Sequence, residues 1–348
     1  MKRSERQYSD AKILFIDLTQ WELAVHCRVP RVLSSLKAQF GDRATWTPGV
    51  GRMRLDCHVI SDPQSFDELR ECVSFNGPVV RASRDVNITY AFEHNRTWLH
   101  VAETAILELD DSAPTRSRVY LGSEPCTDRA PMRGSKRLVA DPEAFLYPLL
   151  AEWIRNFSAC LMHCGAVALG NQAVVLSGPP GSGKSTQVLR LLLRGAQFLA
   201  DDLAIIHCGD GRLEMIAFRE VANVGRRTVE RFPELRDVAG APLRGDGKYC
   251  VDVPAYFGQH ARSRAVPGAI VRLHPDPEPW MERCPREDSL AGIHTMAWFV
   301  SASERSEQHF WLICDWLAAS SQWNVSQGYL AHRLDAFLDR IRLDLGAR

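Results

Sequence analysis

A glycine-rich loop that ends in lysine and serine is the stretch whose residue types are most specific for chemistry. It reads Gly178-Pro-Pro-Gly-Ser-Gly-Lys-Ser185, between an apolar run at Ala173–Leu176 and a leucine-rich helical pattern at Ser185–Arg194. This spacing fits Gly-x-x-x-x-Gly-Lys-Ser/Thr in the strand–loop–helix context of a phosphate-binding loop. Backbone N–H groups of such a loop, and the positive end of the helix dipole, attract phosphate oxygens.

The residue types within this loop indicate separate tasks. Lys184 is expected to reach the β- and γ-phosphates of a nucleotide, and the Ser185 hydroxyl is expected to ligate Mg²⁺. The sequence therefore predicts ATP and Mg²⁺ as the cofactors of this site. The residues expected to hold the nucleotide are Gly178, Pro179, Pro180, Gly181, Ser182, Gly183, Lys184, Ser185 and Thr186.

Two adjacent carboxylates, Asp201 and Asp202, end the next predicted strand, Gln197–Asp202. Ligands of open α/β sheets bind at such strand ends. At a phosphoryl-transfer centre one carboxylate holds Mg²⁺, while another orients the attacking hydroxyl and accepts its proton. A dication would also offset the repulsion between the two carboxylates, which otherwise raises the pKa of one of them. A solvated turn after a strand is the structural alternative.

Three further polar side chains are candidates for the same site. His163 lies on the strand predicted directly before that of the loop, where a lone histidine is more often a packed core residue. Arg244 and Lys248 belong to a glycine-rich turn, and their charges would offset charge that develops on the γ-phosphate, as arginine fingers do. Exposure on a surface turn is the alternative for both residues.

The elements around the loop indicate an α/β core. The runs Met162–Leu169 and Gln172–Leu176, joined by a Gly-Asn turn, predict a β-hairpin whose second strand leads into the loop. A helix is predicted from Asp141 to about Leu161, because its apolar positions follow the helical period. The last strands are expected at Asp252–Tyr256 and Ala269–Leu273.

Shifts in composition divide the chain into five regions. The first part of the chain has short β-rich runs separated by Asp, Gly, Asn and Pro, which is typical of a strand-rich domain. A polar stretch with Pro and Gly follows and favours a linker. The predicted regions are 1–10 disordered, 11–125 strand-rich, 126–138 linker, 139–285 phosphate-loop domain and 286–348 C-terminal helices.

The composition is that of a soluble globular protein. Of 348 residues, 45% are apolar and 24% are charged, and the formal net charge is zero, so nothing predicts binding to nucleic acid or to an anionic membrane. No apolar run approaches the ~18 residues of a membrane-spanning helix. Ten cysteines without a Cys-x-x-Cys pair, and no signal-peptide pattern, favour a reduced cytoplasmic compartment. The composition leaves a homo-oligomer possible.

The residues between His163 and Ile206 resemble the catalytic domain of HPr kinase/phosphorylase and its relatives. The shared features are His163-x-Gly-Ala, the hairpin, Leu-x-Gly-Pro-x-Gly-Ser-Gly-Lys-Ser-Thr, the leucine-rich helix, Arg-Gly-Ala and Leu-Ala-Asp-Asp-Leu-Ala-Ile-Ile. The resemblance extends more loosely over about residues 140–275. It implies an α/β nucleotide-binding core of the phosphoenolpyruvate-carboxykinase type with a mixed sheet, beside the strand-rich N-terminal domain and the C-terminal helices.

The resemblance also implies roles for the site residues and a class of acceptor. It implies that Asp201 is the general base towards a serine hydroxyl, and that His163 lies beside the acceptor. Asp202 and Ser185 would serve Mg²⁺. The Glu-x-x-x-Ile-Arg-Gly-Leu-Gly-Ile signature of the bifunctional enzymes is absent. The nearest resemblance is therefore to kinases that phosphorylate the C-terminal serine of lasso precursor peptides, which implies a peptide or small-protein acceptor.

Two other functions are compatible with the same residues. A small-molecule kinase acting on a sugar, amino acid or antibiotic hydroxyl would use the same core, and the basic stretch Arg219–Arg231 would suit an anionic acceptor. A nucleotide-sensing interaction module would instead bind ATP without transferring its phosphate. Its partners would be held by the N-terminal strands and the aromatic C-terminal helices.

Overall fold

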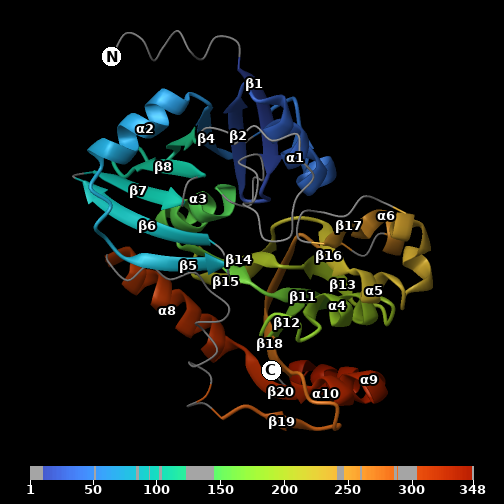
Figure 1. Ribbon diagram of the computed structural model, residues 1–348. Coiled ribbons are helices and arrows are strands. Elements are labelled where there is room, and N and C mark those ends of the chain that lie inside the picture. Colours follow the sequence, from blue (N-terminus) through green and yellow to red (C-terminus); the bar gives the residue numbers. More distant parts are fainter. Residues whose placement is uncertain are drawn as a thin grey trace. The chain divides into compact units, whose positions relative to one another are not determined.

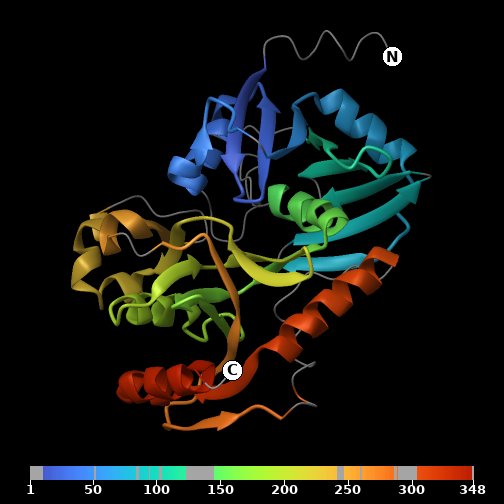
Figure 2. The same ribbon diagram turned by 180° about the vertical axis from the view of Figure 1, so that it is seen from behind.

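The chain divides into two compact units, with a boundary along the sequence between Asn156 and Phe157, and Figures 1 and 2 show their elements from two sides. The predicted disordered residues 1–10 and the predicted linker 126–138 lie outside the residues that the structure describes. In this computed structural model the described residues are 11–50, 52–83, 86–93, 95–101, 104–122, 145–240, 247–258, 261–285, 288 and 304–346.

The first unit is built on a nine-stranded sheet in the order β3-β1-β2-β4-β9-β8-β7-β6-β5. Strands β2, β4 and β9 run parallel to one another, and the other pairs are antiparallel. The strands are β1 Lys12–Asp17, β2 Trp21–Cys27, β3 Ala44–Thr45, β4 Met53–Ile60, β5 Val79–Ser83, β6 Val86–Glu93, β7 Arg96–Val101, β8 Ala105–Asp110 and β9 Arg116–Leu121. The helices are α1 Pro30–Phe40, α2 Pro63–Cys72 and α3 Leu146–Trp153.

Helix α3 ends earlier than the sequence predicts. The predicted helix continued to about Leu161, but the chain passes through a 3₁₀ turn at Ile154–Phe157 and enters strand β10, Ala159–His163. An apolar run of this length has no period that separates a buried helix from a buried strand. Helix α3 also belongs to the first unit, where Tyr90 donates a hydrogen bond to Glu152 and the Trp153 indole donates to a backbone carbonyl.

The second unit contains a mixed nine-stranded sheet. Its main path is β10-β14-β15-β18-β12-β11-β13; β20 pairs with β18, and β19 pairs with β20. The β12–β18 and β18–β20 pairs are parallel, and the others are antiparallel. The strands are β10 Ala159–His163, β11 Gly165–Leu169, β12 Gln172–Ser177, β13 Gln197–Ala200, β14 Leu203–Gly209, β15 Arg212–Ala217, β18 Arg264–His274, β19 Met281–Arg283 and β20 Ser321–Ser326.

A two-stranded ribbon and several helices complete the second unit. The ribbon pairs β16 with β17 in antiparallel fashion. These elements are β16 Val221–Gly225, β17 Lys248–Asp252, α4 Lys184–Leu192, α5 Arg226–Val229, the 3₁₀ helix η5 Pro233–Gly240, α6 Val253–Phe257, α8 Glu304–Ala319, α9 Gln327–His332 and α10 Leu334–Gly346.

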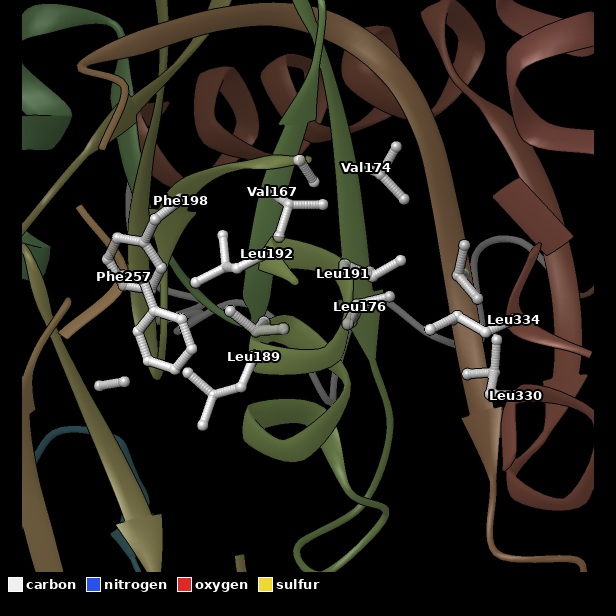
Figure 3. Close-up of a cluster of buried hydrophobic side chains, with 14 of the residues drawn as sticks. Val167, Val174, Leu176, Leu189, Leu191, Leu192, Phe198, Phe257, Leu330 and Leu334 are labelled. Carbon is white, nitrogen blue, oxygen red and sulfur yellow. The ribbon is translucent and has the colours of Figure 1, made fainter. Parts of the chain in front are cut away.

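Apolar clusters lie on both faces of this second sheet. Val174 and Leu176 of β12 belong to one cluster with Leu189 of α4, and Figure 3 labels these side chains among others of that cluster. The intervening Val175 belongs to the other cluster, together with Trp316 of α8. Because successive side chains of a strand point to opposite faces, helices α4, α9 and α10 pack on one face and α8 packs on the other.

The C-terminal half differs from the sequence-based prediction in two places. The region 286–348 was predicted to be helical, yet β20 pairs in parallel with β18, with Ala269 opposite Ser321. The segment Asp252–Tyr256 was predicted to be a strand, yet Asp252 ends β17 and its carboxylate caps α6 by accepting from the Ala255 N–H at 3.1 Å. Among the described residues, no helix is long and apolar enough to cross a membrane.

Candidate functional site

The glycine-rich loop joins β12 to α4, in the strand–loop–helix order that the sequence predicts. Gly178 has φ +147° and Gly183, the N-cap of α4, has φ +87°. A Cβ atom at Gly178 would lie 2.7 Å from the Ser182 Oγ and 2.8 Å from the Leu273 carbonyl oxygen, so only glycine fits there. The loop residues 179–181 are exposed, which leaves its outer side open to a ligand.

Two polar side chains of the loop point to an anionic ligand. The Lys184 ammonium donates to the Gly178 carbonyl at 2.8 Å and, more weakly, to the Pro179 carbonyl at 3.4 Å, so it folds back over the loop. The Ser182 hydroxyl is buried and has no hydrogen-bond partner among the described residues. Buried polar groups are normally satisfied, so such a hydroxyl is suited to a ligand oxygen.

Asp201 lies in the bend after β13 and is almost completely buried, with 1% of its surface exposed. One carboxylate oxygen accepts a hydrogen bond from the Asn223 backbone N–H at 2.7 Å, and the nearby Ser185 side chain acts to lower the pKa of the carboxyl group. Burial and the negative charge of Asp202 raise the pKa of Asp201 to about 6. Its carboxyl group therefore keeps its proton to a higher pH than an ordinary aspartate does.

Asp202 adopts a left-handed backbone conformation with φ +72°. Its carboxylate accepts from the Asn223 side-chain amide at 2.6 Å and from the Arg219 guanidinium at 3.3 Å. Burial acts to raise the pKa of Asp202, but the charges of Arg219 and Lys248 outweigh it and lower the pKa to about 2. The two neighbouring carboxyl groups thus have pKa values on opposite sides of the ordinary aspartate value.

The structure places His163 on a strand that lies one strand earlier along the chain than the sequence predicts. It is the last residue of β10, not part of the hairpin strand β11, and it pairs with Leu203 of β14. The hairpin itself is as predicted, with β11 antiparallel to β12. Burial lowers the pKa of His163 although the charge of Asp202 opposes this, so the imidazole is neutral at pH 7. The next residue, Cys164, donates its backbone N–H to the Asp202 carbonyl at 3.1 Å.

The structure brings most of the predicted site residues together. Lys184, Asp201 and Asp202 interact electrostatically, and Lys248 at the start of β17 acts on both Asp202 and His163. Thr186 hydrogen-bonds through its hydroxyl to Thr228 of α5 at 2.8 Å. Arg244 lies outside the described residues.

Sequence reasoning missed Asn223 and assigned Arg219 only to a basic stretch suited to an anionic acceptor, yet both residues position the carboxylates. Arg219 is fully buried and pairs with Asp202, and Asn223 binds both aspartates, one through its backbone and one through its side chain. The available signal was an arginine in an apolar context, Ile-Ala-Phe-Arg-Glu-Val-Ala. A buried arginine needs a counter-charge, and the adjacent aspartates are the nearest candidates in the pattern.

The donor set fits Mg²⁺ bound together with phosphates. Among the described residues, no group of three or more His, Cys, Asp or Glu side chains could hold a metal ion by itself. Mg²⁺, however, is usually held by one or two carboxylates plus substrate phosphates and waters. The Ser185 hydroxyl and the Asp202 carboxylate supply hard oxygen ligands of this kind.

The comparisons with known proteins include a weak likeness to a solved structure. No protein-family model and no curated protein sequence matches the chain. Among solved structures, the chain is similar to the HPr(Ser) kinase/phosphatase from Coxiella burnetii, with a TM-score of 0.28 and 13% identity over 52% of this chain and 92% of that one. The function proposed below therefore depends on the residues of the site and on the sequence motifs.

Proposed function

We propose that the chain is a kinase that uses ATP and Mg²⁺ to phosphorylate a serine hydroxyl of a peptide or small protein. The observation that carries this proposal is that Asp201 of the carboxylate pair lies close enough to Ser185 of the glycine-rich loop for that side chain to act on its pKa. It couples a loop built for phosphates to a pair of carboxylates with separated pKa values. Separated pKa values of this kind distinguish the acid–base member of such a pair.

The two carboxylates have different roles: one acts as the general base, and the other serves the metal ion. Asp201 is the general base, because burial and its neighbour raise its pKa towards the pH at which a base works best. Asp202 stays ionised because of Arg219 and Lys248, which suits a carboxylate that serves Mg²⁺ together with Ser185. The metal ion supplies charge neutralisation for the transferring phosphoryl group.

The remaining site residues orient the reactants and stabilise charge. Lys184 leaves the loop carbonyls to reach the β- and γ-phosphates, and Lys248 and Arg244 offset the charge that develops on the γ-phosphate. His163 lies close enough to Asp202 for that carboxylate to act on its pKa, and as a neutral imidazole it can position an acceptor hydroxyl without repelling the cationic side chains. Asp201 takes the proton of that hydroxyl as the hydroxyl oxygen attacks the γ-phosphate.

The acceptor class is proposed from the sequence motifs. The resemblance between residues 163 and 206 and the lasso precursor kinases favours the C-terminal serine of a ribosomal precursor peptide. The absence of the bifunctional-enzyme signature favours a kinase without phosphorylase activity.

Phosphate transfer from labelled ATP to synthetic peptides ending in serine tests this function. Wild-type protein is expected to label the serine, and Lys184→Ala to abolish labelling. Asp201→Asn should lower kcat by about 10²–10⁴-fold at saturating Mg²⁺, because the base is lost. Asp202→Asn should raise the Mg²⁺ concentration needed for half-maximal rate.

Asp210→Asn is the matched control for both aspartate variants. Asp210 lies in the exposed turn between β14 and β15 with φ +52°, a conformation that asparagine tolerates well. It should keep the wild-type rate and Mg²⁺ requirement. Full activity of Asp201→Asn would refute the assignment of Asp201 as the base. If no peptide became labelled on a hydroxyl, the proposed kinase function would be refuted.

A further inference from the structure

A cavity of about 590 Å³ opens beside the glycine-rich loop within the second unit. Its lining comes from helix α4, from the α5–η5 segment and from α9, which follows β20. The residues that matter for its chemistry are Thr186, Gln187, Arg190, Arg231, Phe232 and Ala331. A volume of this size is typical of sites that enclose a small organic ligand.

The cavity begins where the glycine-rich loop ends. Thr186 and Gln187 belong to the first turn of α4, directly after Lys184 and Ser185, and they line the cavity. On the opposite wall, the Gln327 amide at the start of α9 donates a hydrogen bond to the Gly181 carbonyl of the loop at 3.4 Å. Lys and Ser of such a loop take the terminal phosphates and Mg²⁺, so the rest of a nucleotide extends away from them.

Arginine side chains in the cavity are suited to binding an aromatic ring. The Arg190 guanidinium is fixed by the Gln187 side-chain oxygen at 3.3 Å and the Ala331 carbonyl at 3.1 Å. The Arg231 backbone N–H donates to the Thr228 carbonyl at 3.0 Å, and its guanidinium makes no hydrogen bond or ion pair among the described residues. Planar guanidinium groups stack on aromatic rings and attract them through their charge. Phe232 adds an apolar ring to the same wall.

We propose that this cavity holds the base and ribose of the nucleotide whose phosphates occupy the glycine-rich loop. The proposal rests on the proposed function, since it requires a nucleotide in the loop. It assigns Arg190 and Arg231 to the aromatic base and makes α9, near the C-terminus, one wall of the nucleotide site. A substitution in the cavity should therefore weaken binding of the nucleoside part without weakening binding of the phosphates.

Calorimetric titration of the full chain with MgATP and with magnesium tripolyphosphate tests this separation. Tripolyphosphate carries the phosphates without the nucleoside. Ala331 is exposed and lines the cavity, so Ala331→Trp fills it without altering the loop. This variant should weaken MgATP binding by about tenfold or more and leave tripolyphosphate affinity unchanged. Ala336→Trp, on the exposed face of α10 and outside the cavity lining, is the matched control and should change neither affinity.

The outcomes distinguish the proposal from the function on which it rests. If wild-type protein binds neither compound, the nucleotide site itself is refuted, and the nucleoside cavity with it. If wild-type protein binds both, but Ala331→Trp leaves MgATP affinity unchanged or weakens both compounds equally, only the nucleoside cavity is refuted.

Photolabelling of the unmodified protein gives a second measurement that does not depend on the folding of a variant. After irradiation with 2-azido-ATP, the labelled peptides should map to residues 226–240 or 327–334, and excess ATP should suppress the labelling. Labelling confined to other parts of the chain would overturn the assignment.

Discussion

At the scale of single residues, the ion pair between Arg219 and Asp202 affects the stability of the protein. Arg219 is fully buried, and the side chain of its partner Asp202 is 23% exposed. Breaking a buried pair costs more than the pair contributes, because it leaves an uncompensated charge. This makes Arg219 a residue that acts on both stability and the charge state of Asp202.

Arg219→Met is expected to destabilise the protein by roughly 2 kcal/mol, below the ~3–5 kcal/mol of a fully buried pair because Asp202 is partly exposed. The free energy of unfolding, measured by urea denaturation, checks this. Adding Asp202→Asn to Arg219→Met should recover most of the loss, since asparagine leaves no charge and tolerates the left-handed backbone at this position. A double variant less stable than the single one would contradict the charge explanation.

Residue types alone predicted several side chains that lie together at the candidate site, but not the groups that hold the two carboxylates. Lys184, Ser185 and the two aspartates follow spacings that phosphate chemistry imposes along the chain. Asn223 lies in ribbon strand β16 and Arg219 lies just before that strand. No local spacing in the sequence links either residue to the two aspartates. Long-range pairing of this kind is set by the tertiary fold, which a local pattern does not encode.

At the scale of elements, strand β20 and the helices after it complete the second sheet and its core. β20 pairs along six residues of β18, and α10 contributes Phe337, Leu338 and Ile341 to the same cluster as α4. The helix that carries Lys184 and Ser185 is therefore packed in a core that the C-terminal segment helps to build. Stability of the loop helix and stability of the C-terminal segment should change together.

Phe337→Ala should lower the free energy of unfolding by about 3–5 kcal/mol, because Phe337 is fully buried and the deletion leaves a cavity. Asp339→Ala, two residues along the same helix and exposed, is the control and should stay within about 0.5 kcal/mol of wild type. Urea denaturation measures both. An equal effect of the two substitutions would show that α10 does not pack in this core.

Two of the segments that the sequence mispredicted share one physical cause. The run Ser158–Leu161 and the segment Ser321–Ser326 are short and apolar or mixed, so their periods do not separate strand from helix. Pairing with distant strands decides both, β10 with β14 and β20 with β18. Helix α1, Pro30–Phe40, is by contrast marked locally, by a proline at its start and Gly41 after its end.

At the scale of the whole molecule, the site residues described above belong to one of the two units. The loop, both aspartates, Arg219 and the nucleoside cavity fall after Phe157, whereas the nine-stranded sheet of the first unit contributes none of them. A ligand that binds only the native form stabilises what it binds, by an amount set by its concentration relative to Kd. MgATP should therefore stabilise the second unit selectively.

Amide hydrogen exchange of the full chain with and without MgATP measures this selectivity. At a ligand concentration of about 100 Kd the gain is about 2.7 kcal/mol for the unit that binds. Protection should increase in α4, in the bend at Asp201 and in α9, while β4, β8 and β9 of the first unit exchange at unchanged rates. Lys184→Ala should abolish the effect everywhere. Equal protection of the first-unit strands would contradict it, because the binding energy would then be shared by a unit that holds none of the site residues.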